Sequence, residues 1–308
     1  MKAVGSPAIS SSSCFEREIP ELKASKKITD LMKAAAKGDA NLLLKLLETE
    51  TDINAQDVFG NTALYYSATS NSVEAVLALL SRGASVKTKN QAGFHALKVA
   101  ARERKTNIIR LLANAGLLQS ARDGDAGFVK ECIEQSADVN VKTSDGWTPL
   151  MIATVKGHPS ILQILLNARA EVNSKNGSGQ TALWLATSMN VADEMRLLIE
   201  GGADVNAQNQ DGWTVLMQAA SENNSQSLKL LINSGADLNL KNWDGETALA
   251  IAEKRGFAEI VSLLTQAGAG NSQDQKQSDG TGTETEAERA SADSQDVIEL
   301  FSVPNFLS

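Results

Sequence analysis

The sequence predicts an all-helical solenoid of about eight helix pairs joined by short β-hairpin loops. A leucine recurs every 33 residues, with a single interval of 20. A small residue follows each leucine three positions later, and an aliphatic pair follows near position fifteen. Such periods are typical of stacked supersecondary units. The marker leucines are Leu31, Leu64, Leu97, Leu117, Leu150, Leu183, Leu216 and Leu249.

The folding of one unit is predicted from residues 145–175. Asp145-Gly146 is a tight-turn signal, because glycine adopts the positive φ that such turns need. Thr148 is placed to cap a helix, and Pro149 suits the first helical position. Apolar residues at helical spacing predict a helix over 150–156 and a second one after Pro159. Helices this short cannot bury their own apolar faces, so the units must stack.

These units resemble the ankyrin repeat family. The sequence Asp145-Gly146-Trp147-Thr148-Pro149-Leu150 stands where that family has Asp-Gly-x-Thr-Pro-Leu, and residues 211–216 and 244–249 are close variants. Residues 201–206, Gly-Gly-Ala-Asp-Val-Asn, match the end of the family's unit. The resemblance covers about residues 29–269. It implies the fold and says little about function, because the scaffold serves unrelated processes.

Three features depart from the family pattern. Proline follows the capping threonine only at Pro149, which should loosen the other helix starts slightly. His95 replaces the capping threonine of the third unit, which puts that cap in doubt. Thirteen residues are missing between Leu97 and Leu117, about the length of a hairpin and its approach. We therefore expect two stacks without an intervening hairpin, and a bend or register break between them.

The chain divides into five expected segments. The repeats form two stacks, and residues 270–308 together carry a net charge of -6, which is most of the chain's -8. Low hydrophobicity predicts disorder at both ends. The segments are a disordered N-terminus (1–26), repeats one to three (27–116), repeats four to eight (117–269), an acidic disordered linker (270–295) and a short hydrophobic C-terminal peptide (296–308).

Residues 296–308 have two interpretations. They carry seven bulky apolar residues behind a polar linker. They are either an unselected terminus or a docking peptide, for a partner or for this protein's own groove.

Composition excludes several classes of function. The acidic pI near 5.0 argues against nucleic-acid binding. No apolar run approaches the roughly 20 residues of a membrane span, and no signal-peptide core is evident, so we expect a cytoplasmic protein, with the nucleus not excluded. His158 is expected to make inter-repeat hydrogen bonds, and Cys132 is expected in the core. We find no catalytic constellation and expect no enzyme activity, cofactor or metal.

The remaining functional candidate is a surface. Hairpin tips and first helices should line one concave side, and positions that folding does not require can specify a partner. Trp147 and Trp213 hold the same place two units apart, so they should lie roughly 20 Å from each other. Exposed tryptophan is enriched in binding hot spots. The candidate partner-binding residues are Trp147, Val155, Lys156, Trp184, Met189, Trp213, Met217, Glu222, Trp243 and Arg255.

Each tryptophan also has a structural interpretation, in which it packs on the neighbouring hairpin. That interpretation is favoured for Trp184, which directly follows a marker leucine, and partner contact is favoured for the other three. The sequence thus predicts a monomeric, non-catalytic adaptor, scaffold or inhibitor that binds another protein. The alternative is a regulatory subunit or effector whose C-terminal peptide docks a second partner or its own groove.

Overall fold

A computed structural model describes residues 26–48 and 52–270, and this part of the chain contains fifteen helices and no strand. One isolated antiparallel bridge joins Gln208 and Thr214. The predicted disordered N-terminus, acidic linker and C-terminal peptide lie at residues outside the described ranges, apart from residues 26 and 270. The all-helical repeat fold is confirmed.

The chain forms two compact units, which divide between Ile109 and Arg110. Unit 1 contains the helix pairs α2 (Lys26–Lys37) with α3 (Ala40–Leu47) and α4 (Ala63–Ser70) with α5 (Val73–Ser81), followed by α6 (Ala96–Arg102). Helix α4 packs against both α2 and α6, and α3 packs against α5. The first helices and the second helices of unit 1 therefore form separate layers.

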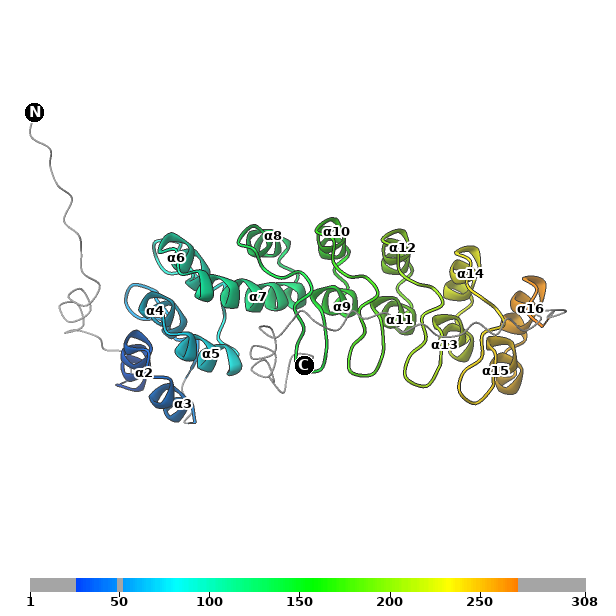
Figure 1. Ribbon diagram of the computed structural model, residues 1–308, viewed down its shortest axis with the longest axis horizontal. Helices are drawn as coiled ribbons and strands as arrows, with labels where there is room; N and C mark the ends of the chain where they lie inside the picture. Colours follow the sequence, from blue (N-terminus) through cyan, green and yellow to red (C-terminus); the bar gives the residue numbers. More distant parts are fainter. Residues whose placement is uncertain (1–25, 49–51, 271–308) are drawn as a thin grey trace, which may run out of the picture. The chain divides into compact units, whose positions relative to one another are not determined.

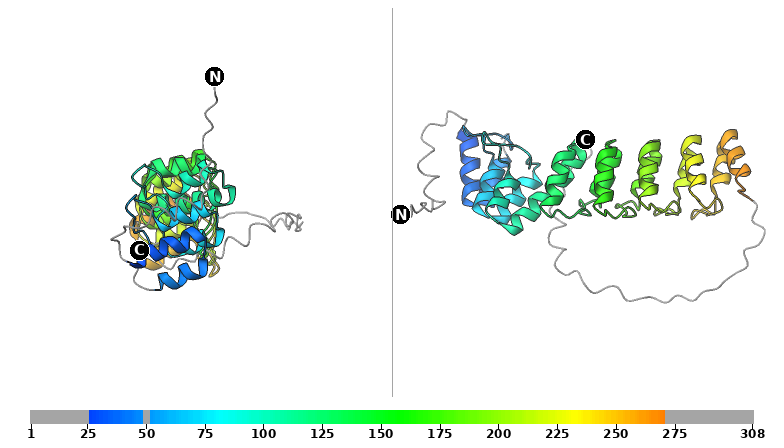
Figure 2. Two further views of the ribbon diagram at one scale, coloured as in Figure 1. Left: turned by 90° about the vertical axis from the view of Figure 1, so that its left-hand side faces the viewer. Right: turned by 90° about the horizontal axis from the view of Figure 1, so that it is seen from above.

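Unit 2 repeats this arrangement (Figure 1). Its second helices lie side by side in one row, as Figure 2 shows from above, and its first helices form a second row. The helices are α8 (Ala126–Glu134), α9 (Pro149–Val155), α10 (Pro159–Asn167), α11 (Ala182–Ser188), α12 (Ala192–Glu200), α13 (Val215–Ser221), α14 (Ser225–Asn233), α15 (Ala248–Arg255) and α16 (Ala258–Gln266).

The marker leucines form the core of both units. Seven of the eight, from Leu31 to Leu216, are 0–1% exposed. The capping role predicted for Thr148 is confirmed. Its hydroxyl accepts a hydrogen bond from the Met151 amide at 3.3 Å. Thr181, which is followed by alanine instead of proline, caps α11 in the same way. A capping threonine therefore starts a first helix with or without the proline.

The doubt about the His95 cap was wrong. The side chain of His95 caps α6, because its Nδ1 accepts a hydrogen bond from the Lys98 amide at 3.1 Å. The ring is only 1% exposed. An unprotonated imidazole nitrogen supplies the same acceptor that a threonine hydroxyl would supply.

Helix α7 (Thr106–Asp123) carries the chain through the place where thirteen residues are missing. Its first half stands where the third repeat has its second helix, and its second half contains the marker Leu117 of the fourth repeat. One helix therefore serves two repeats, which is why fifteen helices build eight helix pairs. The expected domain boundary at 116/117 falls within this helix, and the bend between the two stacks remains a prediction.

Candidate protein-binding surface on the hairpin tips

Each hairpin of unit 2 ends in a four-residue turn, which we call a tip turn. In each of them the amide of the fourth residue donates to the carbonyl of the first, at 2.9–3.1 Å. The fourth residue is always a glycine with φ between +73° and +78°, a conformation that residues with a side chain rarely adopt. The tip turns of unit 2 are residues 143–146, 176–179, 209–212 and 242–245.

Hydrogen bonds between neighbouring repeats hold these tip turns together. The Gly177 amide donates to the Asp145 carbonyl at 2.8 Å. The Gln210 side chain donates to the Gly177 carbonyl at 2.8 Å, and the Trp243 indole N–H donates to the Gln210 carbonyl at 2.7 Å. The second residue of one tip turn thus binds the preceding tip turn, and the four turns form one continuous row.

Unit 1 contains one such junction between its tip turns. The Gln91 amide donates to the Phe59 carbonyl at 3.0 Å, and the Gln91 side chain donates to the Val58 carbonyl at 2.8 Å. Val58 is 54% exposed and Phe59 is 45% exposed. The junction therefore presents two apolar side chains on a hydrogen-bonded support.

A second row of hydrogen bonds runs beneath the tips. In several repeats an asparagine stands 23 positions after the marker leucine. Its side-chain oxygen accepts a hydrogen bond from a backbone amide of the next repeat, 31 residues later. Asn173 accepts from the Asp204 amide and Asn206 from the Asp237 amide, both at 2.8 Å. The repeated asparagines therefore satisfy backbone groups of the following repeat. The contacts join one repeat to the next, so they also fix the repeat spacing on which the tips depend.

Trp243 is the most exposed large apolar side chain among the described residues, at 70%. Its ring lies against Gly212 of the preceding tip turn, where an added Cβ would lie 2.7 Å from Trp243 Cδ2. Packing and the indole hydrogen bond therefore fix the orientation of the ring while leaving most of it open to solvent. A rigid, exposed tryptophan binds a partner at low cost in conformational entropy.

Other predicted residues also reach the surface of unit 2. Met189, which follows α11, is 46% exposed. Glu222 and Arg255 are exposed as well. Four more are partly exposed: Trp147, Val155, Lys156 and Trp213. Eight of the ten predicted residues are therefore at least partly accessible.

Trp184 and Met217 are not accessible to a partner. Trp184 is 6% exposed and Met217 is 1% exposed. Helix α11 packs against α9, α12 and α13, and six of its seven residues are buried. The Met217 sulfur points back toward the start of its own helix and accepts from the Thr214 amide at 3.5 Å. Both residues belong to the core, which corrects their placement on the partner-binding surface.

The C-terminal ends of the first helices carry a charged group. Arg255 Nη1 donates to the Ser221 carbonyl of the preceding repeat at 3.0 Å. Partial burial raises the pKa of Glu222, although a hydrogen bond from Gln218 and the positive charge of Arg255 both lower it. These two predicted residues, Glu222 and Arg255, are therefore electrostatically coupled across adjacent repeats.

The two residues that the sequence assigned to structural roles are confirmed. His158 Nε2 lies 3.1 Å from the Arg122 carbonyl, on the preceding repeat. Cys132 is fully buried, and burial raises the pKa of its thiol to about 12. Within residues 26–48 and 52–270, no group of three or more His, Cys, Asp or Glu side chains is positioned to hold a metal ion. No helix in that part of the chain is both long and apolar enough to span a membrane.

Sequence reasoning missed the contribution of the second residue in each tip turn. Gln91 and Gln210 connect adjacent hairpins, a structural role that their polar character alone does not indicate. Their only signal is position, because each directly follows the asparagine that opens its tip turn. The same position holds Trp243 in the last hairpin, which explains how one side chain can be both a support and an exposed surface.

Comparisons with known proteins agree with this architecture. The model of the family described as "Ankyrin repeats (3 copies)" matches residues 31–121, 117–209, 156–242 and 192–279. The chain is 29% identical over 172 residues to the zebrafish (Danio rerio) ankyrin repeat and SAM domain-containing protein 6, covering 51% of the chain and 23% of the relative.

Two further relatives show the same partial coverage. An L-asparaginase of Dirofilaria immitis is 29% identical over 147 residues, covering 44% of the chain and 25% of the relative. The ankyrin repeat, SAM and basic leucine zipper domain-containing protein 1 of Dasypus novemcinctus is 32% identical over 158 residues, covering 47% and 29%. The chain thus matches less than a third of the length of each relative. Because the family model spans most of the described repeats, the chain belongs to the ankyrin repeat family.

Proposed function

We propose that this chain is a non-catalytic protein-interaction module, an adaptor, scaffold or inhibitor, that binds a partner protein through the tip turns and first helices of unit 2. Ankyrin repeats generally mediate protein–protein interaction, and their stacking creates extended binding surfaces. The partner would contact Trp243, Met189, Trp147 and Trp213 as apolar anchors. Glu222 and Arg255 would supply charged contacts at the edge.

The observation that carries this proposal is the combination of exposure and rigidity at Trp243. A large apolar side chain that is 70% exposed keeps apolar surface in water, and burying that surface under a partner would be favourable. Its indole hydrogen bond and its packing on Gly212 hold it in place before any partner arrives. Preorganised aromatic side chains of this kind are typical of binding hot spots.

The absence of catalysis is part of the proposal. The match to the L-asparaginase covers only a quarter of that protein, so its activity does not transfer to this chain. His158 and Cys132 of unit 2 both serve structural roles. His158 binds a backbone carbonyl, and the Cys132 thiol is buried with a raised pKa. A nucleophile needs the opposite, an accessible group with a lowered pKa.

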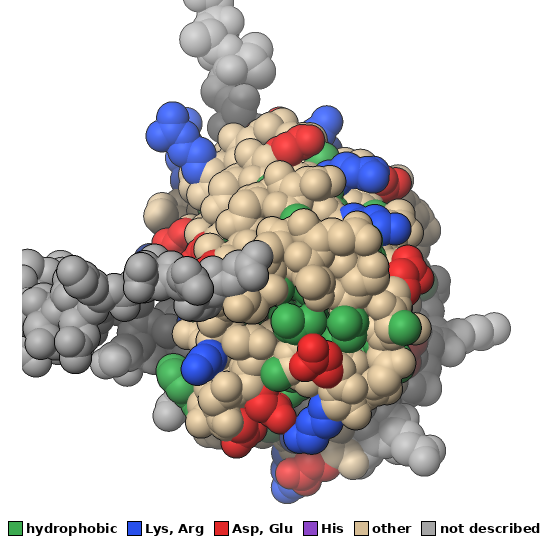
Figure 3. All heavy atoms as spheres, turned by 90° about the vertical axis from the view of Figure 1, so that its right-hand side faces the viewer, with side chains coloured by type: hydrophobic (Ala, Val, Ile, Leu, Met, Phe, Trp, Pro, Cys, Tyr) green, Lys and Arg blue, Asp and Glu red, His purple; other side chains and the backbone are tan. Residues whose placement is uncertain are grey.

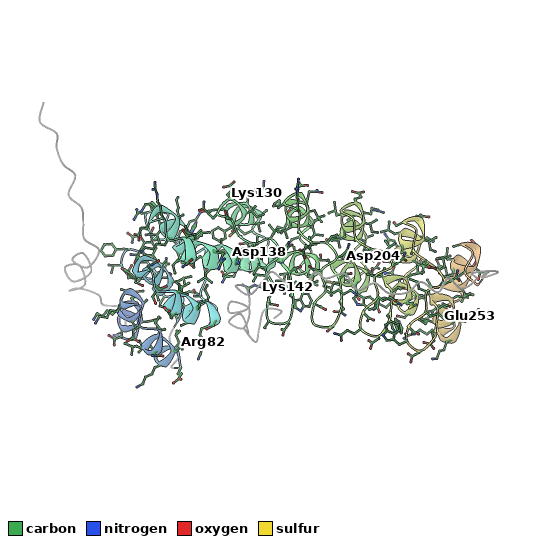
Figure 4. All side chains as sticks on the ribbon, viewed as in Figure 1. Arg82, Lys130, Asp138, Lys142, Asp204 and Glu253 are labelled. Atoms are coloured by element: carbon green, nitrogen blue, oxygen red, sulfur yellow. The ribbon has the colours of Figure 1, made fainter. Side chains whose placement is uncertain are left out.

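Affinity capture with quantitative mass spectrometry tests the proposal. The full chain, a Trp147→Ala/Trp213→Ala variant and a Lys130→Ala control would be compared side by side. Lys130 is exposed on α8, in the row of second helices, away from the tip turns (Figure 4). We expect the double variant to lose at least one specifically captured protein by about tenfold, while Lys130→Ala and the thermal midpoint stay unchanged. Equal capture by all three proteins would contradict the proposed surface.

A further inference from the structure

The last repeat leaves two apolar core positions partly exposed. In the four preceding repeats of unit 2, the marker leucine is 0–1% exposed, whereas Leu249 is partly exposed. The residue twelve positions after each marker leucine shows the same difference. In the last repeat this residue is Val261, which is partly exposed, whereas in the four preceding repeats it is 0% exposed (Val129, Leu162, Met195 and Leu228). The next repeat covers these positions elsewhere in unit 2, and no further repeat follows α16 among the described residues.

Polar residues replace apolar ones at only some positions of this end face. Glu253 is exposed, whereas the residues at the same position of the two preceding repeats, Thr187 and Ala220, are 0% exposed. Figure 4 shows Glu253 at the end of unit 2. Thr265 stands where Ile232 is half-buried. Polar residues therefore replace two core positions, but Leu249 and Val261 remain apolar. Figure 3 shows hydrophobic side chains gathered near the middle of this face, next to acidic ones.

The chain leaves the repeats beside this apolar area. The Gly270 amide donates to Asn239 Oδ1 at 3.2 Å, and a Cβ at Gly270 would lie 3.5 Å from Leu249 Cδ2. The following residues, 271–295, contain alanine as their only apolar residue type, whereas 296–308 carry seven bulky apolar residues. A segment rich in apolar side chains is thus covalently tethered to a partly exposed apolar face.

We propose that residues 296–308 dock on the end face formed by α15 and α16 and cover Leu249 and Val261. Random-coil statistics give a chain of 25 residues an average end-to-end distance of roughly 28 Å, which is sufficient to reach across one end of a helix pair. Tethering at this length gives an effective concentration on the order of millimolar. A contact too weak to form between separate molecules at micromolar concentration would therefore be well populated within one chain.

Hydrogen exchange of the full chain tests this docking. We compare the natural chain with a Leu300→Asp/Phe301→Asp variant, whose changes lie outside the repeats and so leave the core intact. Loss of docking should speed amide exchange in α15 and α16 by about threefold or more, and leave α9 to α12 unchanged. An Ala290→Asp/Ala292→Asp control adds the same two charges to the linker and should exchange like the natural chain. Equal exchange in the natural chain and the Leu300→Asp/Phe301→Asp variant would overturn the proposal.

A reciprocal variant and a dilution series identify the occupant. Leu249→Ser/Val261→Ser should speed exchange in residues 297–303, whereas Leu42→Ser, which changes an exposed apolar residue of unit 1, should not. Docking within one chain predicts the same protection over about a hundredfold range of protein concentration. Protection that appears only at high concentration would assign the face to a second copy and overturn the proposal. Neither measurement involves Trp147 or Trp213, so it can fail independently of the proposed function.

Discussion

The side chain of Asn114 accepts a hydrogen bond from the backbone amide of Asp138, with 2.8 Å between Oδ1 and N. Asp138 stands 21 positions after its marker leucine, where the second repeat and the fifth to eighth repeats also receive an asparagine contact. In a regular pair such as Asn173 and Asp204, the asparagine comes from the end of the preceding repeat. The third repeat lacks that end, and Asn114, which lies within α7, supplies the missing acceptor.

Replacing Asn114 should destabilise unit 2 at its first junction. Asn114→Ala removes the acceptor of the Asp138 amide, and a lost hydrogen bond of this kind costs about 1 kcal/mol. All four tryptophans lie in unit 2, so urea unfolding followed by tryptophan fluorescence reports this unit.

Asn114→Asp keeps a side-chain oxygen acceptor and serves as the matched control, with an expected cost well below that of the alanine variant. An alanine variant as stable as the natural chain would show that the Asn114 contact does not hold the junction together.

His95 should behave as a helix cap in unit 1. His95→Ala leaves the Lys98 amide without its acceptor and should cost about 0.5–2 kcal/mol, whereas His95→Thr restores a capping oxygen. Hydrogen exchange of the α6 amides measures the difference. The alanine variant should exchange faster than both the natural chain and the threonine variant. Faster exchange in the threonine variant than in the alanine variant would contradict the capping role.

Much of the fold could be predicted because its signals are local and repeat in phase. The marker leucines and the capping Thr148 and Thr181 predict helix starts directly, and the structure places them as expected. Asn114 could not be found in this way. It lies 17 positions after its marker leucine, whereas the regular asparagines lie 23 positions after theirs, so the repeat pattern predicts nothing for it.

The binding surface was less predictable because exposure depends on neighbouring repeats. Trp184 and Met217 directly follow marker leucines. This position favoured packing on a neighbouring hairpin for Trp184, but the spacing alone does not show that it lies in the core between helices. In α9 the same position holds Met151, which is 1% exposed. Trp243 was correctly placed at the surface, but its hydrogen bond to the Gln210 carbonyl depends on contact between two hairpins 33 residues apart.

Two glycines with the same backbone conformation should respond differently to alanine. Gly212 has φ +76° and Gly235 has φ +83°, so alanine strains both, at about 1 kcal/mol. An added Cβ meets nothing within 4 Å at Gly235, but at Gly212 it lies 2.7 Å from the Trp243 ring.

Gly212→Ala should therefore lower the stability of unit 2 by clearly more than Gly235→Ala does, as measured by urea unfolding. Equal losses would show that the Trp243 ring does not pack firmly on the preceding tip turn.

Cys132 should resist alkylation in the folded chain. Burial raises the pKa of its thiol to about 12, so almost none is present as reactive thiolate near pH 8. Because the unfolded thiol ionises near 9, its burial stabilises the fold below that pH and progressively less as the pH rises toward 12.

The other cysteine of the chain, Cys14, is changed to serine so that only Cys132 can react. In this Cys14→Ser variant, iodoacetamide labelling at pH 8 should be slow and should accelerate sharply in urea. Rapid labelling without denaturant would contradict a buried, structural Cys132.

If the partner binds through the tip turns of unit 2, it should protect their backbone amides. Hydrogen exchange of the full chain, with and without a protein whose capture depends on Trp147 and Trp213, measures this protection. We expect slower exchange in residues 142–148, 208–214 and 241–247 on binding, and unchanged exchange in α8, α10 and α12. Protection confined to those second helices, with the tip turns unaffected, would contradict it.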